Sequence, residues 1–386
     1  MSYPYALPTT GSISFADYFV DPGDYANEIS EATALRGRLR GVLKEAKRED
    51  DEARDLVRIM KTIEDYLPYL VGIIACLETD TLKLKKEIEF SWRSTLGTSV
   101  LKQTQRIECK GIYYELIFTL LTYGYTSSLW ATSLLAQSGS GPEADRYNKV
   151  ADLLCTAAGI FAFVAEDVVD RFGKTATSKG PPEVVRELPA ALSKIAHADA
   201  EAAGIRKALL LPRTSHSLIA KLYINVTAHY EMAGGLIGSL KGHDVSGDFR
   251  RYLTEGTVYY KALAKKYLAM DANAKQNVGT AVGFIKETKE SLHSLMKSTL
   301  PKTSTSTVAS RAAQEEAIVN EMFTTYNKVN DTVTFQAVPT KADLQTMIPG
   351  GRPLLNVKKY SLPLQAFGPV TEKPETARYA LAGGYF

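Results

Sequence analysis

The sequence predicts a mostly α-helical protein, with an elongated body of paired helices and a small β element near the N-terminus. Up to about residue 330, apolar residues recur at three- and four-residue spacing over most of the chain, which is the period of an amphipathic helix. Strict alternation of apolar and polar residues, which is typical of strands, is confined to short segments. With 386 residues, 45% of them hydrophobic, the chain can bury a large core in one elongated unit.

The first half of the chain is expected to combine two short strands with long helices. Residues 12–15 and 87–92 alternate and predict strands that pair as a small sheet against the helices. Acidic residues 50–52 mark the start of a helix with a core-facing apolar stripe. Further helices are expected at about 104–137, which ends at a Ser-Gly-Ser-Gly-Pro linker, and at about 143–171.

The second half is expected to be a series of helices. The predicted ranges are about 183–211, 215–240, 247–270, 272–298 and 308–330. Small residues fall where neighbouring helices must pack closely, as in tetratricopeptide hairpins. The strict consensus of that repeat is absent, so the hairpins are only tetratricopeptide-like.

The last part of the chain changes character after Asn330. Residues 332–338 alternate and predict a strand that Pro339 ends. Beyond it, proline and glycine recur and predict an extended tail that wraps the helical body. We therefore expect one domain over residues 1–350, and a tail over 351–386 that packs on the domain or extends beyond it.

Composition excludes several classes of protein. The net charge of +3 is too small to argue for nucleic acid, and aromatic residues do not interleave with the basic runs. The three cysteines lack disulfide or zinc spacing and predict buried free thiols in a reducing compartment: Cys76, Cys109 and Cys155. The N-terminus lacks the basic head and apolar stretch of a signal peptide, and no apolar run is long enough to cross a bilayer. A cytoplasmic protein that partners recruit to membranes is expected.

The strongest enzyme-like signal is an acidic cluster of Glu166, Asp167 and Asp170. Such spacing on a helix could hold Mg²⁺ and a diphosphate, as in all-α isoprenoid synthases. These enzymes need a second acidic cluster, and the run that begins at Asn330-Asp331 lacks the downstream acid. No histidine pair has metalloprotease spacing, and phosphate-binding and nucleophile motifs are absent. A solvated helix end is the preferred interpretation, so no catalytic residue, cofactor or metal is predicted.

Two surfaces are candidates for binding. A basic run on one helix could be a solvated face or could contact an anionic membrane: Arg36, Arg38, Arg40, Lys44, Lys47 and Arg48. The segment 218–222 places Leu218 and Leu222 on one helix face with Lys221 beside them. An exposed leucine pair next to lysine suits an acidic amphipathic helix laid into a groove. Burial of both leucines in the core is the alternative interpretation.

Short motifs in a fixed order resemble the BRO domain of Alix-type proteins. They are Phe90-Ser91-Trp92, Tyr113-Tyr114-Glu115 and Asn330-Asp331 followed by Val338-Pro339. The segments 5–15, 65–70 and 311–316 are similar to a short fungal branch of the family that acts in ambient-pH signalling. The resemblance implies a boomerang-like helical fold and a non-enzymatic adaptor.

The resemblance also implies a binding site. In BRO domains the segment that matches 218–222 carries a hydrophobic patch for the C-terminal helix of the main ESCRT-III filament subunit. By this match Leu218, Lys221 and Leu222 bind the partner helix, with Ile205 in place of a patch aromatic and Lys149 as a patch lysine. Further expected partners are a pH-signalling receptor complex and an anionic membrane. Recruitment to the plasma membrane or the endosomal membrane is expected. A general endosomal-sorting protein and a peripheral membrane-binding protein are the alternatives.

Overall fold

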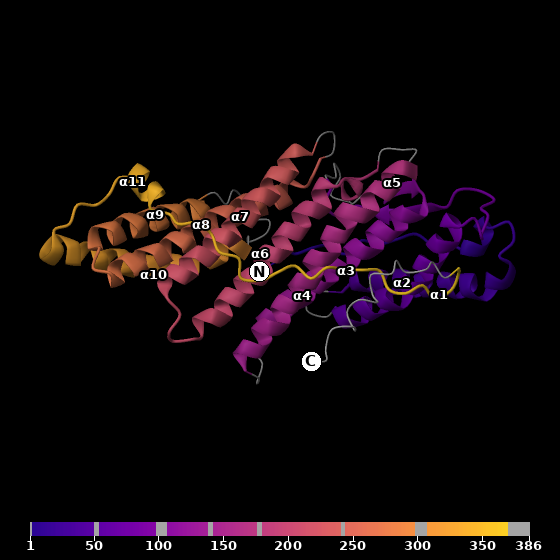
Figure 1. Cartoon of the computed structure of the whole chain (residues 1–386), viewed down its shortest axis with the longest axis horizontal. Coiled ribbons are helices and arrows are strands. Elements are labelled where there is room, and N and C mark those ends of the chain that lie inside the picture. The colour runs from indigo at the N-terminus through magenta and orange to yellow at the C-terminus, as the bar shows by residue number, and fades with distance from the viewer. Residues whose placement is uncertain are drawn as a thin grey trace, which may run out of the picture.

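The molecule is an elongated row of helices with one small sheet, as the sequence predicts. The computed structural model describes residues 2–49, 54–97, 106–137, 142–175, 180–240, 244–297 and 307–369. Successive long helices pack side by side, from α1 and α2 at one end to α9 and α10 at the other (Figure 1). The helices are α1 (Ala26–Ala46), α2 (Leu56–Glu78), α3 (Ile112–Ala136), α4 (Glu143–Phe163), α5 (Val169–Thr175), α6 (Glu187–Leu209), α7 (His216–Ser239), α8 (Gly247–Ala274), α9 (Val278–Lys297), α10 (Thr307–Val329) and α11 (Lys341–Thr346).

The helices expected in the second half of the chain correspond to α6 to α10. Three boundaries differ: α6 begins at Glu187, α8 continues to Ala274 and α9 begins at Val278. The turn between α8 and α9 therefore lies at residues 275–277, where Gln276 adopts a left-handed φ of 63°. The helix expected over 143–171 is also interrupted: a π turn, Val164–Val168, separates α4 from α5.

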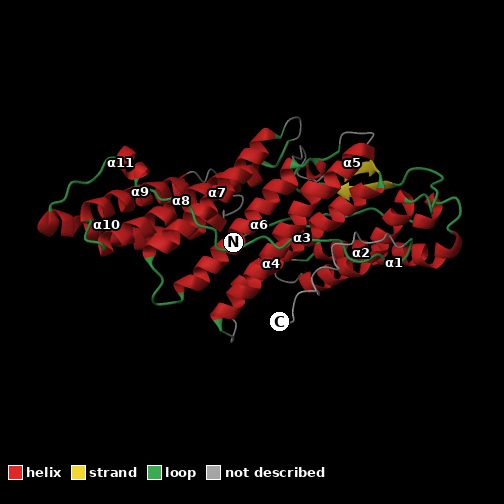
Figure 2. Ribbon diagram, in the orientation of Figure 1, coloured by secondary structure: helices red, strands yellow, loops and turns green. Residues whose placement is uncertain are grey.

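The small sheet lies beside the first helices (Figure 2). Strand β1 (Glu89–Arg93) pairs antiparallel with β2 (Arg106–Lys110), with Phe90 opposite Cys109. Residues 106–110 were expected to begin a helix, and this expectation is wrong. The reason is Gly111, whose φ of 102° ends the strand and separates it from α3.

The strand expected at residues 12–15 is also wrong. The chain forms a 3-10 helix at Phe15–Tyr18, and its first amide is turned inward to donate to the Thr33 hydroxyl. The N-terminal segment does contact β1, however. A single bridge joins Thr10 to Trp92, and backbone bonds run from Gly11 N to Ser91 O and from Arg93 N to Thr9 O.

The closing strand expected at residues 332–338 does not form. Asn330–Thr334 is a π turn, and residues 335–340 have no regular structure. The Asn330 side chain explains the difference. Its Oδ1 accepts from the backbone N–H of Gln336 at 3.0 Å and its Nδ2 donates to the backbone carbonyl of Gln336 at 2.9 Å. The backbone groups of Gln336 are thus bonded locally and need no neighbouring strand.

A buried polar network holds the N-terminal end of the row together. Glu115 on α3 is fully buried and accepts from Arg36 Nε at 2.7 Å and from Trp92 Nε1 at 2.7 Å. The Tyr66 hydroxyl on α2 donates to the same carboxylate at 3.2 Å. Arg36 therefore belongs to the core, and the basic run on α1 is not one continuous charged surface. Cys76, Cys109 and Cys155 are buried and form no disulfide with one another, as predicted.

After α11 the chain returns along the row of helices as an extended segment, residues 349–369, which we call the strap (Figure 1). Its backbone bonds to α7, where Arg352 N donates to the Lys221 carbonyl at 3.0 Å. It then crosses α6 and α4 and reaches α2, where Ala366 N donates to the Pro68 carbonyl at 3.0 Å. Phe367 is buried there against Gly72. The strap therefore spans most of the helical row.

Candidate partner-binding site

The three helices that carry the predicted site lie side by side. α6 packs between α4 and α7, and the Lys207 ammonium near the end of α6 donates to the Asn148 side chain of α4 at 2.8 Å. Lys149, the next residue on α4, is exposed and lies over the Trp130 ring at 4.8 Å. The contact with Trp130 directs Lys149 toward α3, whereas its neighbour Asn148 contacts α6.

The first turn of α7 presents the accessible part of the predicted site. The Ser215 hydroxyl caps this helix by accepting from the Leu218 amide at 3.2 Å. Leu218 and Lys221 are both partly exposed. Leu218 also packs against the main core, so one part of its side chain is accessible and the other is fixed.

The expected exposure of the other two apolar residues is wrong. Leu222 is 3% exposed and Ile205 is 0% exposed, and both belong to the main hydrophobic core. Helix geometry explains why Leu222 is buried, because it shares a helix face with the fully buried Ile219 and Val226, three residues before it and four after it. The spacing that places Leu222 with Leu218 on one stripe also places it with the core stripe.

The strap runs beside this site. A Cβ atom at Gly351 would lie 3.0 Å from the backbone nitrogen of Asn225 on α7. Glycine therefore permits the strap to approach α7 closely. Leu354 packs on Gly204, the neighbour of Ile205 on α6. One flank of the α6–α7 surface is therefore already covered by the chain itself.

An exposed group of leucines at the end of α6 was missed in the sequence. Leu209, Leu210 and Leu211 are 41%, 45% and 62% exposed. They lie at the turn into α7, close in sequence to the basic residues Lys207 and Arg213. The run Leu-Leu-Leu-Pro before the next helix was the available signal, since three consecutive leucines cannot all face one side of a helix.

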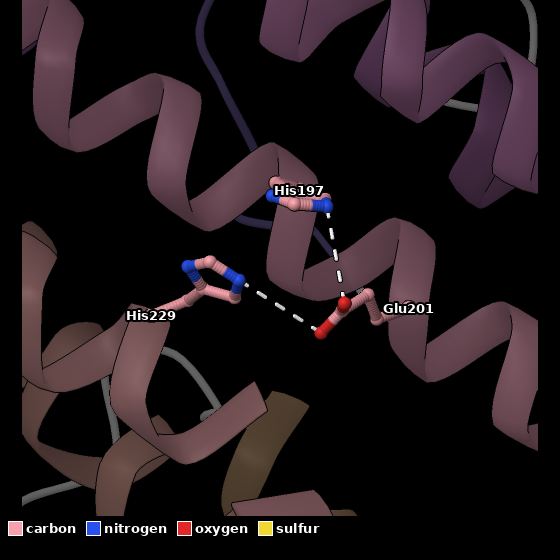
Figure 3. Close-up of side chains that lie close together, drawn as sticks. All are labelled: His197, Glu201 and His229. Atoms are coloured by element: carbon pink, nitrogen blue, oxygen red, sulfur yellow. Dashed lines mark ion pairs between the residues drawn. The ribbon is translucent and has the colours of Figure 1, made fainter. Parts of the chain in front are cut away.

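A polar cluster between α6 and α7 includes His197, Glu201 and His229 (Figure 3) and bonds to the strap. Glu201, with a side chain only 1% exposed, accepts from the Leu354 amide at 3.0 Å and from Asn225 Nδ2 at 2.8 and 3.0 Å. His197 Nε2 lies 2.8 Å from the Leu355 carbonyl, to which it donates. Desolvation by burial lowers the pKa of His229 to about 4, and the neighbouring His197 adds to the effect, so this ring is neutral near pH 7.

The acidic cluster lies far from the second acidic segment of the sequence. Glu166 and Asp167 are exposed on the π turn that follows α4. Asn330 and Asp331 follow α10, near the opposite end of the row of helices (Figure 1). The structure therefore does not bring the two segments together around a common cavity.

The structure offers no candidate for a membrane-spanning helix: within the described ranges, no helix combines the length and the apolar character that crossing a bilayer requires.

The class of protein follows from this architecture and from comparison with known proteins. The BRO1-like domain family matches residues 14–365, and the chain belongs to this family. Among curated relatives it is similar to the pH-response regulator protein palC of Cryptococcus neoformans var. neoformans serotype D (strain B-3501A). The two are 29% identical, over 95% of this chain and 93% of that one.

Solved structures show the same fold. The chain superimposes on ALIX in complex with the SIVmac239 PYKEVTEDL late domain with a TM-score of 0.72 and 15% identity. That match covers 96% of this chain and 50% of that one, so this chain spans about half the length of that ALIX chain. In the ALIX BRO1–CHMP4C complex the TM-score is 0.68 at 15% identity, over 95% of this chain and 98% of that one.

Proposed function

We propose that this protein is a non-catalytic adaptor that binds the C-terminal helix of the main ESCRT-III filament subunit and links it to fungal alkaline-pH signalling. The observation that carries the proposal is the partial exposure of Leu218 and Lys221 near the start of α7. A relative of known structure, the ALIX BRO1 domain, forms a complex with CHMP4C. The curated relative at 29% identity is a pH-response regulator.

The proposed binding mode is an amphipathic helix lying along the start of α7. Leu218 is the apolar contact at the surface, whereas Leu222 and Ile205 belong to the core against which Leu218 packs. Lys221 and Lys149 would attract an acidic flank of the partner. Burial of one leucine contributes about 1.5–3 kcal/mol, so a few such contacts give affinities near the micromolar range after the cost of ordering.

The test is binding of a peptide of the ESCRT-III C-terminal helix to purified variants. Leu218→Asp and Lys221→Glu are expected to weaken binding by at least about tenfold, because each changes the surface without entering the core. Leu364→Asp is the matched control, since Leu364 is an exposed leucine on the strap, away from α7. Wild-type affinity in both α7 variants, with normal circular dichroism, would reject this location.

A link to pH signalling needs a cellular test. We propose that the adaptor acts with a pH-signalling receptor complex, and that partners recruit it from the cytoplasm to the plasma membrane or the endosomal membrane. Cells that carry only Leu218→Asp are then expected to grow poorly at alkaline pH and to lose the membrane-associated fraction of the protein. Normal alkaline growth of cells that lack the whole chain would contradict this role.

A second candidate function is direct peripheral contact with an anionic membrane. The exposed Leu209, Leu210 and Leu211, with Lys207 and Arg213 nearby, favour it. Leucines that enter the interface and basic residues worth about 1 kcal/mol each near anionic lipid would add their effects. Co-sedimentation with anionic vesicles that is lost in Leu211→Asp, with peptide binding intact, would support this candidate.

The domain organisation is part of the proposal. We propose one folded unit over residues 1–350 and a tail over 351–386 whose described part is the strap. The bonds from Arg352 to α7 and from Ala366 to α2 support a tail that packs on the domain.

A further inference from the structure

The polar cluster beneath the strap brings three metal-ligating side chains together. His197 and Glu201 are four residues apart on α6 and share one face, and His229 faces them from α7 (Figure 3). Each histidine Nε2 lies 3.9 Å from a different oxygen of Glu201. One ligand atom from each residue lies within 4.8 Å of the other two.

Among the described residues, no lysine or arginine balances the negative charge of Glu201 at the centre of this cluster. The Glu201 side chain is 1% exposed, and among the described residues no lysine or arginine forms an ion pair with it. Its hydrogen-bond partners are the neutral Asn225 amide and the Leu354 backbone N–H. A buried carboxylate with only dipoles around it carries a desolvation cost that a bound cation would offset.

The arrangement of donors marks the place that a cation would take. Asn225 Nδ2 lies 2.8 and 3.0 Å from the two Glu201 oxygens and 3.3 Å from His229 Nε2. Because an amide nitrogen only donates, His229 Nε2 presents its lone pair toward the same point. The other ring nitrogen, Nδ1, is buried without a hydrogen-bond partner among the described residues. Both Glu201 oxygens and His229 Nε2 therefore face the partly positive NH₂ group of the Asn225 side chain.

We propose that His197, Glu201 and His229 bind a divalent transition-metal ion of the zinc class, and that the ion fastens the strap to the helical body. Two imidazoles and one carboxylate are ligands that zinc accepts. The Leu355 carbonyl lies 2.8 Å from His197 Nε2 and provides an oxygen of the strap at the edge of the site. The ion would thereby join α6, α7 and residue 355.

Side-chain movements are needed to form the site. Zinc bonds of about 2.0–2.2 Å place tetrahedral ligand atoms about 3.3 Å apart. The two 3.9 Å separations must therefore shorten by roughly half an ångström, and a separation at the 4.8 Å limit by about 1.5 Å. His197 moves its proton from Nε2 to Nδ1, which is a change of tautomer without net charge. The Asn225 amide rotates away from Glu201. The Leu355 carbonyl, released by His197, then faces the ion.

The direct test measures zinc binding to the full chain after treatment with a chelator. Titration calorimetry with ZnCl₂ is expected to give one site per chain with micromolar or tighter affinity. His229→Gln and His197→Gln should each weaken it by at least about tenfold. His293→Gln is the matched control, because His293 is an exposed histidine on α9 that pairs with Glu316. It should bind zinc as the wild type does.

A second readout does not depend on the folding of the variants. Co²⁺ bound to the wild-type chain is expected to give the intense visible absorption of a four-coordinate site, and zinc should remove it. Zinc should also slow proteolytic cleavage within residues 351–369 of the wild type. No zinc binding by the wild type, or equal binding by wild type and His229→Gln, would overturn the proposal, as would only the weak absorption of six-coordinate Co²⁺.

Discussion

At Glu115 a guanidinium, an indole and a phenol converge on one buried carboxylate, whereas the carboxylate of Glu201 has only neutral donors. The two acids therefore differ in what their removal would do. At Glu115 the partner Arg36 is itself buried, and its positive charge is balanced by the acid. At Glu201 the neighbours are an amide, a backbone N–H and two imidazoles.

Loss of the charge at Glu115 should destabilise the whole fold. Glu115→Gln leaves the buried Arg36 without its counter-ion, and the expected cost is about 3–5 kcal/mol in the free energy of unfolding. Urea denaturation followed by circular dichroism measures it. Glu31→Gln is the control, because Glu31 forms an exposed ion pair with Arg38 on α1, the helix that carries Arg36. This variant should change the free energy of unfolding by less than about 1 kcal/mol. Equal effects would contradict the role given to the buried pair.

Glu183 should give stability a characteristic pH dependence. Burial raises the pKa of this carboxyl above its ordinary 4.5, so between that value and the higher folded-state pKa the native state binds more protons than the unfolded state. Its contribution to stability therefore decreases as pH rises through this window. Glu183→Gln keeps an acceptor for the Thr95 and Leu96 amides. The variant should be tolerated and should lose this part of the pH dependence in unfolding measured from pH 4 upward. A variant with the wild-type slope would exclude Glu183 as its source.

Leu218 and Leu222 should respond differently to the same substitution. Leu222→Asp places a charge in the core and is expected to cost about 4 kcal/mol or more, whereas Leu218→Asp should cost about 1 kcal/mol. Thermal unfolding of the two variants separates the cases. A stable Leu222→Asp protein would mean that this side chain is accessible in solution.

At the scale of elements, the helices were predictable because their 3.6-residue period runs over many turns. Short alternating runs were predicted less well. The strand expected at 87–92 contains β1, whereas at 332–338 the Asn330 side chain bonds the backbone locally, and residues 106–110, expected to be helical, pair with β1. For the candidate site, spacing placed Leu218 and Leu222 on one face but could not decide which side of it is covered. Glu201 and His229 come together only through the packing of α6 on α7, which no local pattern encodes.

The strap can be displaced at α4 without loss of the helix beneath it. The Lys358 carbonyl contacts Gly159 so closely that a Cβ there would overlap it. Gly159→Ala should therefore move the strap away from α4, while the helix itself gains up to about 1 kcal/mol of intrinsic stability. Limited proteolysis is expected to cut residues 351–369 faster in this variant.

The control for that experiment is a glycine with free space around it. Gly234 on α7 has nothing within 4 Å of its Cβ position, so Gly234→Ala should stabilise the helix and leave the cleavage rate of the strap unchanged. Unchanged cleavage in Gly159→Ala as well would mean that the contact on α4 does not hold the strap.

At the scale of the whole molecule, the strap joins parts of the chain that are far apart in sequence. The bonds of Leu354 to Glu201 and of Leu355 to His197 close loops of 153 and 158 residues, and the contact with α2 closes a longer one. Loop closure over such separations is entropically costly, so we expect these contacts to form late in folding. Local helix packing does not require them.

Removal of residues 349–386 should therefore leave a helical protein with reduced stability. Far-ultraviolet circular dichroism is expected to remain close to that of the full chain, and the midpoint of thermal unfolding should fall. The loss of Phe367 from its place on α2 contributes to the fall, since it is a buried aromatic side chain. An unchanged midpoint would show that the strap adds nothing to the free energy of unfolding.

A stack of helices flexes by small rotations that accumulate from one interface to the next. Here the strap is bonded along one side of the row of helices, to α7 through Arg352, to α6 through Leu354 and to α2 through Ala366. Bending that lengthens this side must stretch an already extended backbone, whereas bending that shortens it meets no such resistance. We therefore expect the row of helices to resist bending that lengthens the strap side more than bending that shortens it.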